Sequence, residues 1–124
     1  MSITTLRTAI AASLMFAAGT AVAAFPNKPV KFVVPFPAGG ATDLMARATA
    51  IEFTEALGKN VVVSNTGGGA GTVGTAAVAR ARKDGYTLGV VPAAPLVNQP
   101  HMRKTPYQAD SFDYICQLFY SPLS

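Results

Sequence analysis

Short β-branched runs alternate with alanine-rich helical stretches along the chain after residue 23, and this alternation limits the fold more than any other feature. Strands are predicted at residues 30–34, 61–63, 86–91 and 114–119. Helices are predicted from the Gly39–Asp43 segment to Leu57, at 73–82, and more weakly at 96–102. Strands joined through helices pair in parallel by right-handed crossovers. We therefore predict an α/β fold whose open, mostly parallel sheet is flanked by helices.

Apolar side chains on the first predicted helix fall in two stripes, which are typical of a helix packed between a sheet and another element. The stronger stripe is Ala46, Ala50, Phe53 and Leu57, and the weaker one is Leu44, Ala48 and Ile51. Gly58 follows as the expected C-terminal cap. The continuous valines of the 61–63 strand predict burial on both faces of the sheet.

The first 23 residues differ in composition from the rest of the chain. Arg7 is their only charge, residues 9–18 form an apolar run, and Ala21-Val22-Ala23 has the small side chains that a signal peptidase reads. We predict a signal peptide at 1–23, cleaved near Ala23, and export to the periplasm. The alternative is a membrane anchor, but the run is shorter than the ~20 strongly apolar residues that spanning needs. Cys116, the only cysteine, is expected to be a small core residue.

Composition excludes several classes of protein. Half of the 124 residues are apolar and 13% are charged, which is unlike a disordered polyelectrolyte or a coiled coil. The net charge is +4, but the basic residues are scattered, so a nucleic-acid surface is not favoured. His101 is the only histidine, is expected in a surface loop, and has no nucleophile motif to pair with it. No metal-ligand spacing occurs. We predict no enzyme activity, no metal and no cofactor.

The loop at residues 35–43, between the first strand and the first helix, is suited to bind an anion. Ligands of open α/β sheets bind at the carboxyl ends of the strands. Gly39 and Gly40 let backbone amides approach a ligand, and the helix start adds unpaired N–H donors. Thr42 or Asp43 is a candidate helix cap. For Asp43 we favour such a structural cap, which would fix the loop, over direct contact with the ligand, because an aspartate facing the anion would repel it.

A second glycine-rich loop, residues 65–74, follows the second strand. Gly69, Gly71 and Gly74 satisfy the G-x-G-x-x-G pattern of dinucleotide-binding folds. In those folds the pattern directly follows the first strand, and an acidic residue lies ~20 positions later, at the end of the next strand. Here the third strand is followed by Pro92-Ala93 instead. A dinucleotide site is therefore not favoured, which leaves an anion-binding loop and a simple turn as the two interpretations.

Several motifs together resemble one known family. Residues 33–43, followed by Ala46-Arg47, are similar to the signature of the Bug family, the periplasmic solute receptors of tripartite tricarboxylate transporters. The segments 55–58 and 84–88, with the asparagine and glycines of 65–74, also resemble that family. The resemblance covers residues 25–118. It implies a two-lobed, type II periplasmic-binding fold that captures a small organic carboxylate for membrane permease subunits.

The resemblance also implies the site residues. In that family, the loop after the first strand holds a carboxylate through backbone amides and ordered water. The positions that match the three strand-end loops are Phe36, Ala38, Gly39, Gly40, Thr42, Asp43, Gly68, Gly69, Ala70, Gly71, Thr72 and Ala93. A two-lobed receptor of this type needs about twice this length. Residues 24–124 are therefore expected to be an incomplete N-terminal lobe, a fragment of the receptor.

Two other functions stay open from the residues alone. An exported α/β enzyme would use the same loops to bind a phosphate or an acyl substrate. A sensor or interaction module would use a bound ligand to act on a membrane partner. Turnover of model esters would favour the first alternative, and capture of membrane proteins would favour the second.

Overall fold

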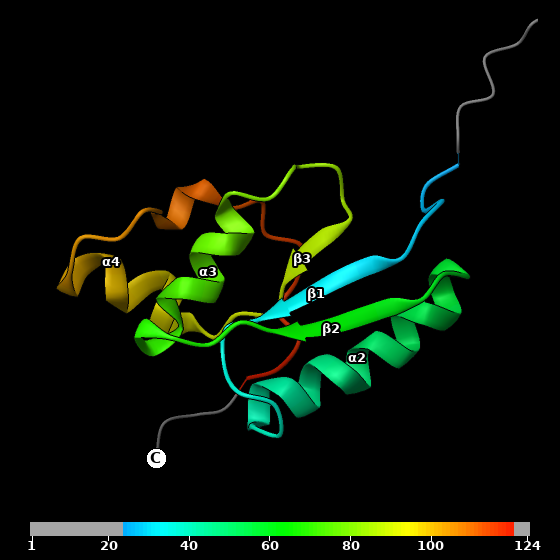
Figure 1. Cartoon of the computed structure of the whole chain (residues 1–124), viewed down its shortest axis with the longest axis horizontal. Coiled ribbons are helices and arrows are strands. Elements are labelled where there is room, and N and C mark those ends of the chain that lie inside the picture. The colour runs from blue at the N-terminus through cyan, green and yellow to red at the C-terminus, as the bar shows by residue number, and fades with distance from the viewer. Residues whose placement is uncertain (1–23, 121–124) are drawn as a thin grey trace, which may run out of the picture.

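The structure, a computed structural model, describes residues 24–120 and contains the predicted alternation of strands and helices (Figure 1). The elements in chain order are β1 (Val30–Val34), α2 (Ala41–Leu57), β2 (Val61–Asn65), α3 (Thr72–Ala79), β3 (Thr87–Gly89) and α4 (Gln99–Met102). Single helical turns lie at Gly69–Gly71, Ala94–Asn98 and Ala109–Ser111. The predicted signal peptide lies outside the described residues. No described helix has the length and apolarity that would let it cross a membrane.

The three strands form one parallel sheet with the order β2-β1-β3. Val30 lies beside Val61, and Lys31 lies beside Thr87. This arrangement confirms the predicted parallel α/β sheet. The carboxyl ends of all three strands point toward the same edge, on the left of Figure 1, where the loops that follow them gather.

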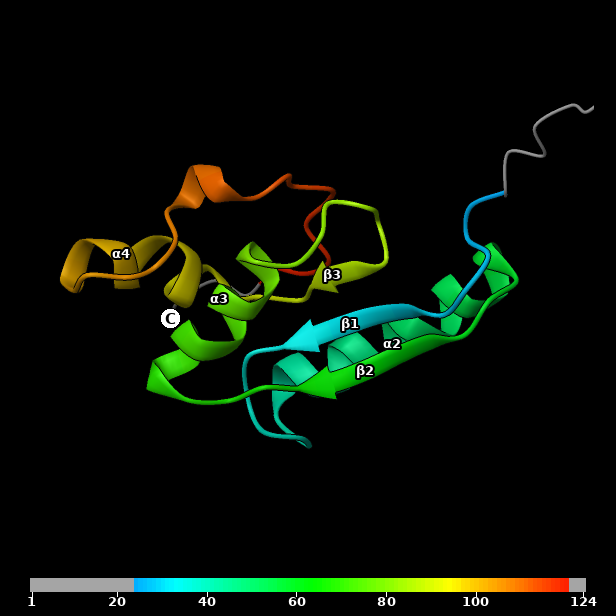
Figure 2. The same ribbon diagram turned by 45° about the horizontal axis from the view of Figure 1, so that its top comes forward.

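The core lies between β1 and α2. Val30, Phe32 and Val34 of β1 are almost completely buried and pack with Ala46 and Ala50 of α2. These residues confirm the stronger predicted stripe on the helix. Figures 1 and 2 show α2 along one face of the sheet and α3 on the other side, near the strand ends. The central strand is therefore covered on both faces at the edge where the loops meet.

The weaker stripe of α2 does not pack as predicted. Leu44 and Ile51 are 60% and 64% exposed, and no other described element covers them. The predicted burial of the second strand is also wrong, because Val62 of β2 is 53% exposed. The reason is topological: β2 is an edge strand in the described part of the chain, and α2 covers only one of its faces.

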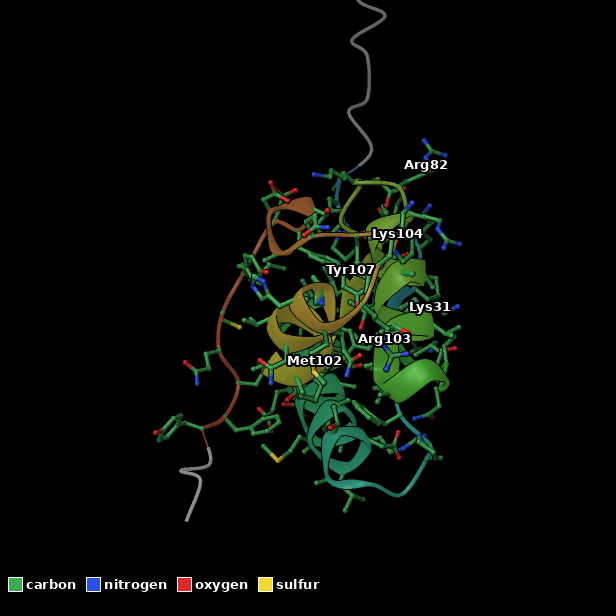
Figure 3. All side chains as sticks on the ribbon, turned by 90° about the vertical axis from the view of Figure 1, so that its left-hand side faces the viewer. Lys31, Arg82, Met102, Arg103, Lys104 and Tyr107 are labelled. Atoms are coloured by element: carbon green, nitrogen blue, oxygen red, sulfur yellow. The ribbon has the colours of Figure 1, made fainter. Side chains whose placement is uncertain are left out.

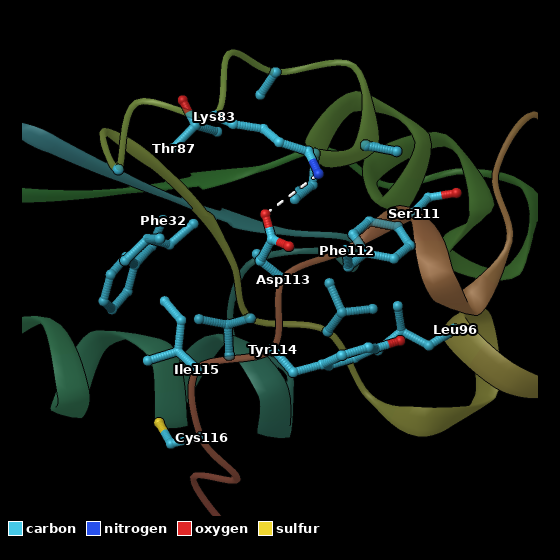
Figure 4. Close-up of a pocket in the computed structure, with 18 of the residues that line it drawn as sticks. Phe32, Lys83, Thr87, Leu96, Ser111, Phe112, Asp113, Tyr114, Ile115 and Cys116 are labelled. Atoms are coloured by element: carbon cyan, nitrogen blue, oxygen red, sulfur yellow. Dashed lines mark ion pairs between the residues drawn. The ribbon is translucent and has the colours of Figure 1, made fainter.

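The predicted fourth strand, at 114–119, is absent from the described structure. Those residues form no strand or helix and are exposed, and Cys116 is not the core residue that we expected. An apolar, β-branched run predicts burial, but a strand forms only where a neighbouring backbone is available for pairing. The outer edge of β3 offers three residues, and the segment passes α2 instead (Figure 4).

One aromatic residue, Tyr107, connects the segment after α4 to the turn at Ala94–Asn98. Tyr107 is 3% exposed, and its hydroxyl donates a hydrogen bond of 2.6 Å to the Pro95 carbonyl oxygen. Burial raises the pKa of this phenol, so it stays protonated and can donate. Tyr107 is buried, whereas its neighbours Arg103 and Lys104 are exposed (Figure 3). The contact links the chain after α4 to the helical 94–102 region, where the sequence predicted a weak helix at 96–102.

Candidate functional site

The loop between β1 and α2 presents unpaired backbone donors at the carboxyl edge of the sheet. The helix starts at Ala41, after Gly40 in an extended conformation with φ −75° and ψ 166°, and no side chain caps it. Within residues 24–120, the N–H groups of Gly40, Ala41 and Thr42 have no hydrogen-bond acceptor. The start of a helix carries about half a positive charge, so these three donors form a place suited to an anion.

A shallow pocket of about 350 Å³ lies at this start of the helix. It is lined by Phe36, Pro37, Gly40, Ala41, Thr42 and Pro92. Its size lies within the range of small-molecule sites. Three of the predicted site residues, Phe36, Gly40 and Thr42, therefore come together here. Pro92, from the loop after β3, closes the opposite side, whereas its predicted neighbour Ala93 is exposed and does not line the pocket.

Asp43 lies beneath the loop and does not line the pocket. Its side chain is 2% exposed, and Oδ2 accepts hydrogen bonds from the Gly39 N–H at 2.8 Å and from Arg47 Nε at 2.9 Å. The hydrogen bond from Arg47, with those from Gly39 and Asn65, lowers the pKa of this carboxyl to about 2. The carboxylate thus fixes the loop, as the sequence favoured. The amide that Asp43 accepts from, that of Gly39, precedes the helix, and no side chain bonds to the N–H groups of the first turn. The predicted capping of the helix by a Thr42 or Asp43 side chain is therefore wrong.

The Gly39 amide is consequently not free for a ligand. It is the donor to Asp43, whereas the next amide, of Gly40, has no acceptor in the described structure. Gly39 has a φ of +84°, which is the left-handed region that favours glycine. That conformation turns the Gly39 amide inward to the carboxylate, and the following amides are left at the pocket.

Asn65 is a structural partner of the site whose role the sequence did not reveal. It ends β2, and its Nδ2 donates to the Phe36 carbonyl oxygen at 3.0 Å and to Asp43 Oδ1 at 2.9 Å. Its Oδ1 accepts from Arg47 Nη2 at 3.3 Å. Its position at the end of a predicted strand could have indicated this role, because parallel neighbouring strands bring their carboxyl ends together at one edge of the sheet.

The second glycine loop satisfies many of its own donors. The N–H groups of Gly71 and Val73 bond to the Gly68 carbonyl oxygen, and the Thr72 hydroxyl bonds to the Gly69 carbonyl oxygen. None of the predicted residues of this loop, including Ala70, lines the pocket over α2.

The two glycine loops nevertheless pack against each other. Gly71 is buried, and a β-carbon built on it would lie 3.1 Å from both Phe36 and Pro95. The absence of a side chain at Gly71 thus lets all three strand-end loops meet. In the structure the second loop supports the first loop rather than lining its pocket.

A second pocket, of about 340 Å³, lies on the far side of β3 and is mainly apolar (Figure 4). The segment after residue 110 covers it, and an ion pair between Lys83 and Asp113, at 3.3 Å, spans part of its lining. Within residues 24–120, no three histidine, cysteine, aspartate or glutamate side chains converge where they could bind a metal. Neither pocket contains His101, which is exposed.

Comparison with known proteins assigns the family. Residues 45–124 match the family model of the tripartite tricarboxylate transporter family receptor. This chain is a member of that receptor family. A UPF0065 protein of Bordetella pertussis is 35% identical over 117 residues, which are 94% of this chain and 36% of that protein. The match confirms the resemblance stated from the sequence. The site thus belongs to a member of a receptor family rather than of an enzyme family.

Two solved structures support the same assignment. The periplasmic binding protein BugD is 52% identical, with a TM-score of 0.51, over 52% of this chain and 22% of that one. MatC of Rhodopseudomonas palustris, solved with bound malate, is 34% identical with a TM-score of 0.57, over 69% of this chain and 30% of that one. This chain therefore spans about a third or less of the length of the receptors that it matches.

Proposed function

We propose that this member of the receptor family binds a small organic carboxylate in the periplasm, with the loop between β1 and α2 receiving one carboxylate group. The observation that carries the proposal is that the three residues with unpaired amides, Gly40, Ala41 and Thr42, line one pocket. A carboxylate oxygen accepts hydrogen bonds only, so it complements a group of donors that contains no acceptor.

The walls of the pocket support the same ligand class. Phe36, Pro37 and Pro92 line the pocket with apolar atoms and offer no competing charge or acceptor side chain. Hydrogen bonds to an ionised group are stronger in such surroundings than in water. Ala38 and the second loop belong to the shell around this group, with Gly68 to Thr72 holding its position.

The chemical class of the ligand and its destination follow from the family. MatC was solved with malate, a small dicarboxylate, and we extend that class to this chain. A receptor of a tripartite transporter delivers its ligand to permease subunits in the membrane, and we propose the same partners here. The predicted export signal is consistent with this location.

The test is a nuclear magnetic resonance titration of the chain with malate. The amide resonances of Gly40, Ala41 and Thr42 are expected to shift saturably, and that of Gly39 much less, because its N–H is already bonded to Asp43. Malamide, the neutral diamide of malate, is the matched control and should leave these resonances in place. Equal shifts with both compounds, or shifts elsewhere only, would contradict the proposal.

One substitution removes a single donor with little change to the backbone. Proline is tolerated in the first turn of a helix. Gly40, which would precede it, already has the extended conformation that a residue before proline prefers. Ala41→Pro should therefore keep the fold and weaken malate binding by about tenfold, the value of one charge-assisted hydrogen bond at ~1.5 kcal/mol. Ala41→Ser, which retains the N–H, should bind like the unmodified chain. Undiminished binding by a folded Ala41→Pro variant would show that this amide is not a ligand donor.

A further inference from the structure

The carboxylate of Asp43 lies in the same first helical turn as the amides that face the pocket, and its charge opposes an anionic ligand. We propose that Arg47 is a specificity-determining positioning residue, which permits anion binding by cancelling the charge of Asp43 without touching the ligand. This inference rests on the proposed function of the loop. It assigns a role in binding to a residue outside the pocket.

The geometry places the two opposing charges together and away from the pocket. Arg47 follows Asp43 by four residues on α2, and its Nε lies 2.9 Å from Asp43 Oδ2. Its Nη2 also donates to Asn65 Oδ1, at 3.3 Å, so the guanidinium is held from two sides. Arg47 does not line the pocket over α2. Any effect of Arg47 on the ligand therefore passes through Asp43.

The repulsion between the Asp43 carboxylate and a bound carboxylate can be estimated from their spacing along the helix. One turn rises about 5.4 Å, so a carboxylate held by the first-turn amides would lie roughly 6 Å from that of Asp43. Two like charges at this distance, in surroundings with an effective dielectric constant of about 40, repel by an amount equal to about tenfold in affinity. With Arg47 in place, the pair is neutral, and the amide donors act on the ligand alone.

A structural role for Arg47 predicts a different pattern of variants. If Arg47 only held the loop, every change at Arg47 or Asp43 would loosen the donors and weaken binding. If Arg47 cancels charge, removing both charges together restores neutrality and should restore binding. The double substitution Asp43→Asn with Arg47→Gln separates the two explanations, because both replacements keep side chains that form hydrogen bonds at nearly the same size.

The experiment measures malate affinity at low salt from the Gly40 amide resonance, in the full chain and four variants. Arg47→Gln is expected to bind about tenfold more weakly than the unmodified chain. Arg47→Lys, which keeps the charge, and the double variant should both bind within about threefold of it. Arg80→Gln is the control for net charge, since Arg80 lies at the far end of α3, and it should change nothing. Salt at ~1 M should reduce the loss in Arg47→Gln.

Four outcomes would overturn the inference. If Arg47→Gln binds malate as well as the unmodified chain, or if the double variant stays as weak as Arg47→Gln, the charge of Arg47 does not control binding and the proposed function stands. If the unmodified chain shows no response to malate, both proposals fall. Should Arg47→Gln not fold, Asp43→Asn alone decides: charge cancellation predicts malate binding at least as tight as in the unmodified chain, and weaker binding would refute it.

Discussion

Helix α3 passes close to the ends of β1 and β2 at Gly74, and an alanine there should separate the helix from them. A β-carbon built on Gly74 would lie 2.4 Å from the Thr66 carbonyl oxygen, 2.7 Å from Pro35 Cα and 2.9 Å from Pro35 Cβ. All three atoms belong to backbone or to a rigid proline ring. No rotation of a side chain can relieve these overlaps, so α3 would have to move away from the end of β1.

Two opposing free-energy terms determine how much Gly74→Ala changes the free energy of unfolding. In an open helix, replacing glycine by alanine stabilises by about 1 kcal/mol. Adding an atom to a packed interior costs about 1–3 kcal/mol, and overlaps with backbone lie at the upper end or beyond. We therefore expect Gly74→Ala to lower the free energy of unfolding by about 2 kcal/mol, a large part of the total for a domain of this size.

Urea unfolding followed by circular dichroism measures this change. Gly67→Ala is the matched control, because its β-carbon would meet only Pro37, at 3.8 and 3.9 Å, which is ordinary contact. The control should unfold within about 0.5 kcal/mol of the unmodified chain. If Gly74→Ala is as stable as the control, the contact between α3 and the strand end is not as close as the structure has it, and the support for the first loop must come from elsewhere.

Two further predictions concern the first loop. The pKa of Asp43 is about 2 in the folded chain, below its ordinary value of 3.8, so its contribution to stability is complete above pH 4 and is lost as the pH falls through 2. Urea unfolding from pH 6 to 2 should therefore show a steeper acid loss in the unmodified chain than in Asp43→Asn, and parallel curves would contradict the assigned hydrogen bonds. A β-carbon built on Gly39 would meet no atom within 4 Å, but its φ is +84°, so Gly39→Ala should cost about 1 kcal/mol through backbone strain alone, and Gly39→Asn less. Equal unfolding midpoints for Gly39→Ala and the unmodified chain would refute the left-handed conformation.

Several elements of the fold could be predicted from short segments of the sequence. β1, α2 and the Gly58 cap were predictable because their signals lie within a few residues: a β-branched run, a helical stripe, and a glycine that adopts φ 62°. The order of strands and loops then predicted that the three strand-end loops would lie at one edge of the sheet, but not which of their amides would be left without a partner. The motifs at 33–43, 55–58, 65–74 and 84–88 together pointed to the receptor family, which the family match confirmed.

Tertiary structure decided what those local signals could not. The sequence did not show that the Gly39 amide turns to Asp43, or that Asn65 joins Phe36, Asp43 and Arg47, because each contact depends on how two strand ends approach each other. The 114–119 run has the composition of a strand, but pairing requires a partner at the right distance, which composition does not encode. Local propensity thus determined where most of the described helices and strands form, whereas the direction of each donor and the exposure of each apolar side chain followed from contacts between elements far apart in the chain.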